Sequence, residues 1–251
     1  MRFEIKHRTA YRYAIPATEA YLEARLIAPD TSAQTVEERE ILIDPDLTTS
    51  EYVDAFENRV EFFSMTLRHA RLTIENRMIV ETHGQSLPTS ALQVPVAEAR
   101  QVFASSLIDH FDYLQPTVAV PTGGPAFPWA KRHLWSARPL GEALGALNEA
   151  IYRHFEYKSG STDNSTLLAT VWKQRKGVCQ DFAHVMLSVL RSVGLPSRYV
   201  CGYIETDAPP GRRLVGAVAT HAWVEVLVPG LSWVALDPTN NQWCGERHVS
   251  V

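Results

Sequence analysis

RKGVCQDFAHVMLSVLRSVGLPSRYVCGYI, residues 175–204, is the stretch that decides the fold. From Cys179 onward its apolar residues recur at helical spacing. At about 100° per residue, one stripe holds Cys179 together with Phe182, Ala183, Met186, Leu190 and Val193. Gly194 and Pro196 then give a helix stop signal. The sequence therefore predicts a helix with Cys179 at the N-terminal end of its buried stripe.

Cys179 has two interpretations. A free cysteine is among the most buried residue types and commonly packs as a small apolar side chain. A thiol at a helix N-terminus can instead act as a nucleophile, because the helix end and a nearby histidine both stabilise the thiolate. The free N–H groups of the first turn also suit an oxyanion on a substrate. A base and an orienting group elsewhere in the chain would favour the second interpretation.

THAWVEVLVPGLSWVALDPTN, residues 220–240, supplies both groups. The alternation in HAWVEVLV predicts a strand that begins at His221, and WVALDPT predicts a return strand that ends at Pro238. A three-residue loop, Pro229 to Leu231, would place His221 and Asp237 on the same face as diagonal neighbours. An even-numbered loop would separate them. In the first register Asp237 can fix the tautomer of His221 and leave the other ring nitrogen for the thiol.

Other polar residues near Cys179 fit structural roles better. His184 lies about 140° around the helix from Cys179, which predicts packing or hydrogen bonding. Gln180 and Asp181 suit the positive end of a helix and could also line a cleft. Cys201 is expected to be a buried thiol on a strand, and Cys244 to lie in a loop.

The N-terminal 80 or so residues predict antiparallel strands. Apolar and aromatic residues alternate in RFEIKHRTAYRYAIP, and EEREILID, RVEFFSMTL and ARLTIENRMIVET are further strand-like runs. Asn58 is a candidate turn residue with positive φ. We expect an N-terminal β-rich, sandwich-like domain over residues 1–90.

The remainder predicts a connection and a mixed domain. Residues 91–138 are rich in proline, although VAEARQVFASSLI within them could form a short helix. Residues 139–251 open with the helix-like stretch LGEALGALNEAIYRHFEY, followed by LLATVWKQR, the Cys179 helix and strands. The expected fold class is α+β.

Bulk properties exclude several partners. A formal net charge of −4 and a pI near 6.1 give no basic field for nucleic acid or an anionic membrane. No apolar run is long enough to span a bilayer, and the first residues lack the apolar region of a secretory signal. Three distant cysteines fit reduced thiols, and no CxxC pair suggests zinc. These features predict a cytoplasmic protein without a metal.

Three separated segments carry a family resemblance. GVCQDFAHVMLSVLRSVGLPSRYVCGYI, HAWVEV and WVALDPTN occur in this order with matching flanks, and with them the chain resembles the bacterial transglutaminase-like superfamily of cysteine-protease-like proteins. FEYKSGST is similar to the segment before the family's nucleophile, and the N-terminal strands resemble the β-rich domain that accompanies the core. The resemblance covers nearly the whole chain.

The resemblance implies a papain-like transglutaminase core, in which a helix carrying the nucleophile packs on an antiparallel sheet. It assigns the nucleophile to Cys179, the general base and acid to His221 and the orienting carboxylate to Asp237. It implies no metal or organic cofactor, and the sequence has no acidic cluster to match the calcium sites of animal transglutaminases. Relatives generally continue past the equivalent of ERHVSV, so we expect a further segment to be absent from this sequence.

These features together predict a cysteine peptidase or amidase that acts on a protein or peptide amide through a thioester. Hydrolysis is favoured because nothing in the sequence identifies a site for an amine acceptor. Transamidation, as in a protein-glutamine gamma-glutamyltransferase, is the first alternative. A non-catalytic binding or scaffold module is the second, and the intact set of three residues argues against it. The sequence predicts neither the substrate side chain nor the oligomeric state.

Overall fold

The chain forms two compact units. The structure, a computed structural model, describes residues 1–84, 90–135, 137–206, 214–217 and 219–251. One unit comprises Met1–Gln85 and Gly245–Val251, and the other comprises Ser86–Cys244. Residues 245–251 were expected in the second domain, yet they group with the first. Two hydrogen bonds explain this, because the Gln34 amide donates to Ser250 O and accepts from Ser250 N, each over 2.9 Å.

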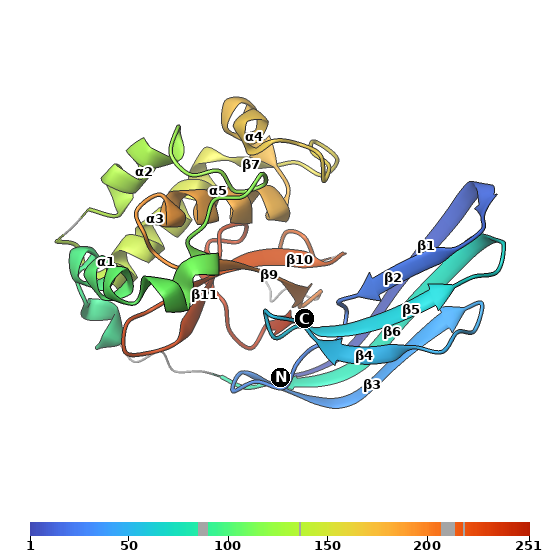
Figure 1. The fold of residues 1–251 in the computed structure, drawn as a ribbon. Helices are drawn as coiled ribbons and strands as arrows, with labels where there is room; N and C mark the ends of the chain where they lie inside the picture. The colour runs from blue at the N-terminus through green and yellow to red at the C-terminus, as the bar shows by residue number, and fades with distance from the viewer. Residues whose placement is uncertain (85–89, 136, 207–213, 218) are drawn as a thin grey trace. The chain divides into compact units, whose positions relative to one another are not determined.

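The first unit is a β-sandwich, which confirms the expected antiparallel architecture. Its sheets have the orders β1-β6-β3 and β2-β5-β4, and the neighbouring strands in both are antiparallel. Both sheets contribute to one core: Ala24, Phe63, Met65, Leu72 and Ile74. The strands drawn in blue to cyan in Figure 1 are β1 (Arg2–Ala17), β2 (Ala20–Ala24), β3 (Gln34–Asp44), β4 (Ser50–Val53), β5 (Arg59–Met65) and β6 (His69–Thr82). β13 (His248–Ser250), near the C-terminus, belongs to the same compact unit.

Two strands and one turn of this unit differ from the sequence prediction. β2 and β4 are only five and four residues long. β2 alternates over too short a run to stand out in the sequence, and β4 is exposed throughout. The positive φ of the turn before β5 belongs to Glu57, at 67°, not to Asn58. Asn58 instead donates its side-chain amide to Asp54 over 2.9 Å. The carboxylate of Asp54 therefore organises this turn.

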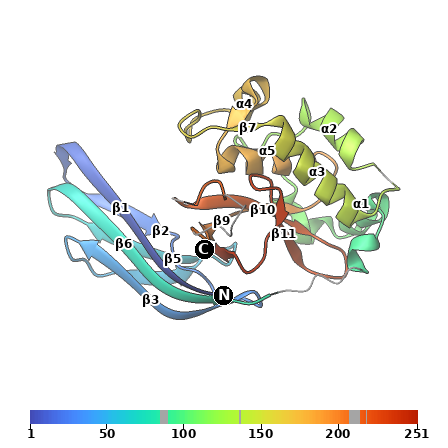
Figure 2. The same cartoon turned by 180° about the vertical axis from the view of Figure 1, so that it is seen from behind.

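The second unit packs helices on one face of an antiparallel sheet, in which the strands from this unit have the order β12-β11-β10-β9. Figures 1 and 2 show α2, α3, α4 and α5 on the same side of β9 and β10 from both viewpoints. The α-helices are α1 (Val96–Ser105), α2 (Ala126–His133), α3 (Leu140–His154), α4 (Leu168–Gln174) and α5 (Cys179–Arg191). The strands are β7 (Glu156–Tyr157), β8 (Lys176–Gly177), β9 (Ser197–Ile204), β10 (His221–Leu227), β11 (Trp233–Asp237) and β12 (Gln242–Trp243).

The proline-rich connection contains more helix than its composition predicts. α1 confirms the expected short helix, and η1 (Ala91–Gln93) and η2 (Leu107–Tyr113) are short 3-10 helices. α2 was missed because it contains Pro128. That proline lies in the first turn, where a backbone N–H has no partner within the helix, so its missing donor costs nothing. Residues 85–89, at the end of the expected N-terminal domain, and residue 136 of the expected connection lie outside the described residues.

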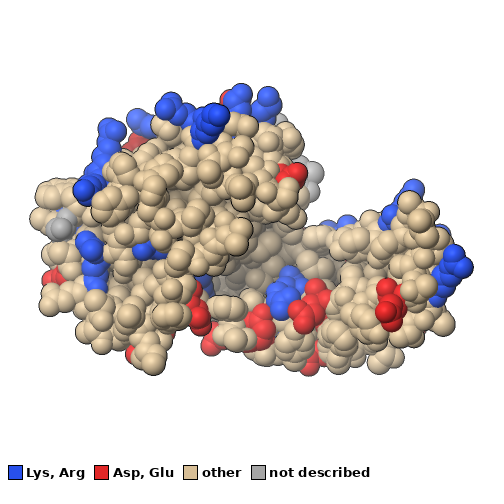
Figure 3. Space-filling model, turned by 45° about the horizontal axis from the view of Figure 1, so that its top comes forward, with Lys and Arg blue, Asp and Glu red and all other residues tan. Residues whose placement is uncertain are grey.

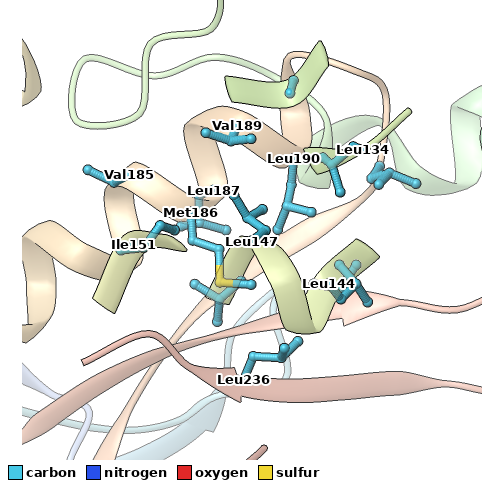
Figure 4. Packing of buried hydrophobic residues seen from close by; sticks show 14 of the residues in the cluster. Leu134, Leu144, Leu147, Ile151, Val185, Met186, Leu187, Val189, Leu190 and Leu236 are labelled. Atoms are coloured by element: carbon cyan, nitrogen blue, oxygen red, sulfur yellow. The ribbon is translucent and has the colours of Figure 1, made fainter. Parts of the chain in front are cut away.

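α5 is the central element of this unit. The sequence predicted one buried stripe, but Val185, Leu187 and Val189 are buried as well. The reason is that α5 contacts β9 and β10 on one side and α2, α3 and α4 on others. Figure 4 shows side chains from α5, from α3 and from Leu236 of β11 converging in one cluster. The predicted stop is confirmed, since α5 ends at Arg191 and Gly194 has φ of 78°.

The helices carry basic side chains on their exposed surfaces. Lys131 and Arg132 of α2 are exposed, as are Lys173 of α4 and Arg175 directly after it. Figure 3 shows lysine and arginine side chains standing apart from one another along the margin of the helical unit. The expected absence of a nucleic-acid partner stays a prediction.

Leu147→Ala should destabilise the second unit by about 2–5 kcal/mol, because Leu147 is fully buried on α3 and its removal leaves a cavity. All six tryptophans lie in this unit, so urea unfolding followed by tryptophan fluorescence reports on it. Leu167→Ala is the control, since Leu167 is 58% exposed, and its effect should stay within about 0.5 kcal/mol. Equal effects of the two substitutions would contradict the packing described.

Candidate active site

Cys179 is the first residue of α5 and is half-buried against the core of the second unit. The strand β8 that leads to it pairs in parallel with β7, with Tyr157 opposite Gly177. Val178 follows in an extended conformation and caps the helix. The thiol therefore stands where the chain changes from strand to helix, next to N–H groups that have no acceptor within the helix.

The buried carboxylate of Asp181 fixes this helix start. Its Oδ2 accepts the N–H of Val178 over 2.8 Å and the hydroxyl of Thr162. This is half of a capping box, because valine has no side-chain acceptor to complete it. A Cβ on Gly177 would lie 2.6 Å from the same Oδ2, so only glycine fits there. Asp181 was expected at the positive helix end, and the structure confirms that place.

His221 and Asp237 are brought together by the predicted register. Val224 lies opposite Leu236 and Leu227 opposite Trp233, and the N–H of Val228 donates to Ser232 O over 3.1 Å. The three-residue loop is thus confirmed. His221 begins β10 and Asp237 ends β11, and Nε2 of His221 lies 2.9 Å from Oδ2 of Asp237. Both side chains are completely shielded from solvent.

Asp237 accepts hydrogen bonds at both oxygens. Oδ1 accepts the N–H groups of Thr239 and Asn240, over 2.9 and 3.2 Å. Oδ2 accepts the side-chain amide of Asn240 over 2.7 Å in addition to the ring of His221. Several hydrogen-bond donors to one carboxylate stabilise its ionised form in a buried site. The carboxylate is also prevented from turning away from the ring.

The surroundings of His221 favour its charged form. Burial, the largest single effect, lowers its pKa, but the hydrogen bond to Asp237, a hydrogen-bond interaction with Cys179 and the charges of both partners together outweigh burial and raise the pKa to about 9. The second ring nitrogen, Nδ1, is buried and makes no conventional hydrogen bond to any residue described. Hydrogen bonds between catalytic groups are often poorly aligned before substrate binds. The structure thus brings Cys179, His221 and Asp237 into one interacting set.

Three further groups interact with the Cys179 thiol. Burial raises the pKa of Tyr157, Tyr199 and Cys201, and a negative charge on Cys179 raises each of them further. The Cys201 thiol also receives hydrogen bonds from Gly202 and Thr220, which offset only part of the shift. Cys201 therefore stays protonated at neutral pH and is the poorer nucleophile.

The other residues considered from the sequence lie outside this set. His184 packs against Tyr199, with ring centroids 5.4 Å apart, and burial lowers its pKa, which confirms a packing role. Cys244 follows β12, where its N–H donates to Ala235 O over 2.9 Å, and burial raises its pKa well above the usual value. Sequence reasoning missed Asn240, although the run DPTN is a turn signal that could have found it.

Two negative findings apply to the described residues alone. Among them, no group of three or more His, Cys, Asp or Glu side chains could hold a metal ion. In the same part of the chain, no helix combines the length and apolar character needed to cross a bilayer.

The free energy of unfolding should depend on pH through the charge of His221. In a Cys179→Ala background, which removes thiol ionisation, the stability advantage of His221 over His221→Gln should be complete below about pH 6.5. It should fall as pH rises above about 6.5, because the hydrogen bond to Asp237 and its charge still raise the pKa of His221, so the folded state holds a proton that the unfolded state has lost. Each unit of the pKa shift corresponds to about 1.4 kcal/mol. Urea unfolding across this range measures the difference.

His184→Gln is the matched control, because burial lowers the pKa of His184. The contribution of His184 to the free energy of unfolding should change only below about pH 6.5. It should become unfavourable as pH falls, because the folded state binds fewer protons there than the unfolded state. A flat difference for His221→Gln between pH 6.5 and 9 would contradict the charged imidazole.

Two family models match the chain. Residues 129–238 match the transglutaminase-like superfamily, and residues 3–81 match the bacterial transglutaminase-like N-terminal region. A crystal structure of a candidate cysteine protease from Cytophaga hutchinsonii superimposes with a TM-score of 0.74 at 21% identity, covering 100% of this chain and 80% of that one, and it shows the same fold.

Sequence relatives extend the comparison. An uncharacterized protein of Mycobacterium tuberculosis is 36% identical over 264 residues, spanning 100% of this chain and 82% of the relative. A protein-glutamine gamma-glutamyltransferase of Pseudomonas aeruginosa is 40% identical over 107 residues, which is 41% of this chain but only 16% of that protein. Because the family matches cover most of both units, the chain belongs to the transglutaminase-like superfamily and carries its bacterial N-terminal region.

Proposed function

We propose that this protein transfers acyl groups from the amide bond of a protein or peptide, with Cys179 as nucleophile, His221 as general base and acid, and Asp237 as orienting residue. The observation that supports this best is the pair formed by His221 and Asp237, 2.9 Å apart and fully buried, whose remaining ring nitrogen has no conventional partner beside a helix-terminal thiol. A purely structural histidine would be expected to use both ring nitrogens.

The proposed chemistry has two stages. The thiolate of Cys179 attacks the amide carbonyl carbon, and the N–H groups of the first turn of α5 stabilise the oxyanion. The carbon–nitrogen bond then breaks, the leaving amine takes a proton from His221, and a thioester remains on Cys179. In the second stage an acceptor gives its proton to His221 and attacks the thioester carbonyl, the carbon–sulfur bond breaks, and the Cys179 thiolate is released beside the protonated His221.

Water is the acceptor that we favour, and the product is then a carboxylic acid. A primary amine is the second candidate, which would give a new amide. It is supported by the similarity between part of this chain and a protein-glutamine gamma-glutamyltransferase. Asp181, the carboxylate two residues after Cys179, already accepts the N–H of Val178 and the hydroxyl of Thr162. The protein or peptide substrate and the cytoplasmic location stay predictions.

Reactivity of Cys179 tests the nucleophile. At pH 6, iodoacetamide should label one cysteine rapidly and stoichiometrically, because an adjacent imidazolium maintains a thiolate there. Cys179→Ala should remove the fast phase, and His221→Ala should slow it by at least about tenfold. Cys201→Ala is the control and should retain it, because Cys201 is the protonated neighbouring thiol. Peptide mapping by mass spectrometry identifies the labelled residue.

Slow, uniform labelling of all three cysteines at pH 6 would contradict a catalytic role and favour a scaffold.

The acceptor is tested with a glutamine-containing peptide mixture in ¹⁸O water, with and without a labelled primary amine. Hydrolysis should place ¹⁸O in the new carboxylate and leave the amine unincorporated. Amine incorporation that depends on Cys179 and His221 would instead establish transamidation. Intact mass measurement of Cys179 with its bound acyl group, trapped by acid quenching, identifies the donor.

A further inference from the structure

We propose that Asn240 is a positioning residue that ties Asp237 to the backbone of Val215 and thereby holds Gly216 against the Nδ1 edge of His221. The inference rests on the proposed function, because it concerns how the imidazole is aimed at the thiol.

Asn240 donates hydrogen bonds to both oxygens of the Asp237 carboxylate. Its backbone N–H donates to Oδ1 over 3.2 Å, and its side-chain Nδ2 donates to Oδ2 over 2.7 Å. Oδ2 is also the oxygen that lies 2.9 Å from Nε2 of His221. Rotation of the carboxylate away from the ring would therefore break bonds to Asn240 at the same time.

The other end of the Asn240 amide holds a different segment. Its Oδ1 accepts the N–H of Val215 over 2.8 Å, and its Nδ2 donates to Val215 O over 3.2 Å. Both main-chain groups of Val215 are thus bound by one planar amide. Asparagine suits this place because its side chain offers a donor and an acceptor side by side, whereas an ionised aspartate only accepts.

Gly216, the next residue, lies in contact with the imidazole. Its φ is 88°, and a Cβ added there would lie 2.6 Å from Nδ1 and 3.2 Å from Cε1 of His221. Bare main chain therefore passes along the edge of the ring that carries Nδ1. Since Nδ1 makes no conventional hydrogen bond to a described residue, the glycine confines the ring without occupying that nitrogen.

One amide therefore fixes the imidazole at both ends. It acts at Nε2 through Asp237 and at the Nδ1 edge through Val215 and Gly216. The competing interpretation is that Asn240 only closes a tight turn after β11. A turn-closing role predicts lost stability with unchanged thiol reactivity, whereas a positioning role predicts a changed pH dependence of that reactivity.

The test measures the iodoacetamide rate constant of Cys179 from pH 5 to 9 in the full chain. Asn240→Ala should lower the iodoacetamide rate constant at pH 6 by about tenfold or more. It should also move the midpoint of the pH profile of that rate constant up by at least about one pH unit. Gly216→Ala should do the same. In the double variant the loss of rate constant at pH 6 should be close to that of the slower single variant, because both substitutions act by displacing the His221 ring.

Asn148→Ala is the matched control. Asn148 is buried on α3 and donates to Asn241 Oδ1 over 3.4 Å, so it supports the same turn through the residue that follows Asn240. The melting temperature of the Asn148→Ala variant should fall. Its iodoacetamide rate constant should stay within about twofold of the wild type, and the midpoint of its pH profile within about 0.3 pH units.

Three results would overturn the proposal. The first is an Asn240→Ala variant with wild-type rate and midpoint, and the second is multiplication of the two single effects in the double variant. If Asn240→Ala fails to fold, Gly216→Ala decides, since it leaves the Asn240 amide intact, and an unchanged profile there is the third. Absence of a fast phase in the wild type would instead overturn the proposed function, and the role of Asn240 with it.

Discussion

The hydrogen bond between Nε2 of His221 and Oδ2 of Asp237 is the constraint on which the site depends. It crosses two strands, so its existence depends on a loop of three residues between β10 and β11. One residue more or less would move Asp237 to the other face of the sheet. Because both side chains are fully buried, loss of either partner would leave a charge or a polar group without compensation in the interior.

The Cys179 thiol is positioned by a separate element, the N-terminus of α5. The pairing of β7 with β8 places Gly177, Asp181 caps the helix, and Cys179 follows the cap as the first helical residue. Burial of α5 on several sides makes this helix a rigid support, since side chains from α3 and β11 pack against it. A reactive group on a rigid element can be held in the geometry that acyl transfer needs.

Local patterns were sufficient for part of this structure. α5, its stop at Gly194 and the β10–β11 register follow from helical periodicity, glycine chemistry and loop length, all of which act within about twenty residues. β4 and α2 could not be predicted in this way, because β4 is an exposed strand and α2 includes Pro128. The link from Asn240 to Val215 was also hidden, since it joins residues 25 positions apart through a side chain. Such contacts are set by tertiary packing, which composition and periodicity do not encode.

The central claim is that His221 is an imidazolium held between Asp237 and the Cys179 thiol. Nitrogen-15 NMR of the His221 ring, assigned by comparison with His221→Gln, tests it most directly. The expected result is a ring protonated on both nitrogens at pH 7.5 that loses its proton only near pH 9. A neutral ring at pH 7.5, with one nitrogen bare, would contradict the claim.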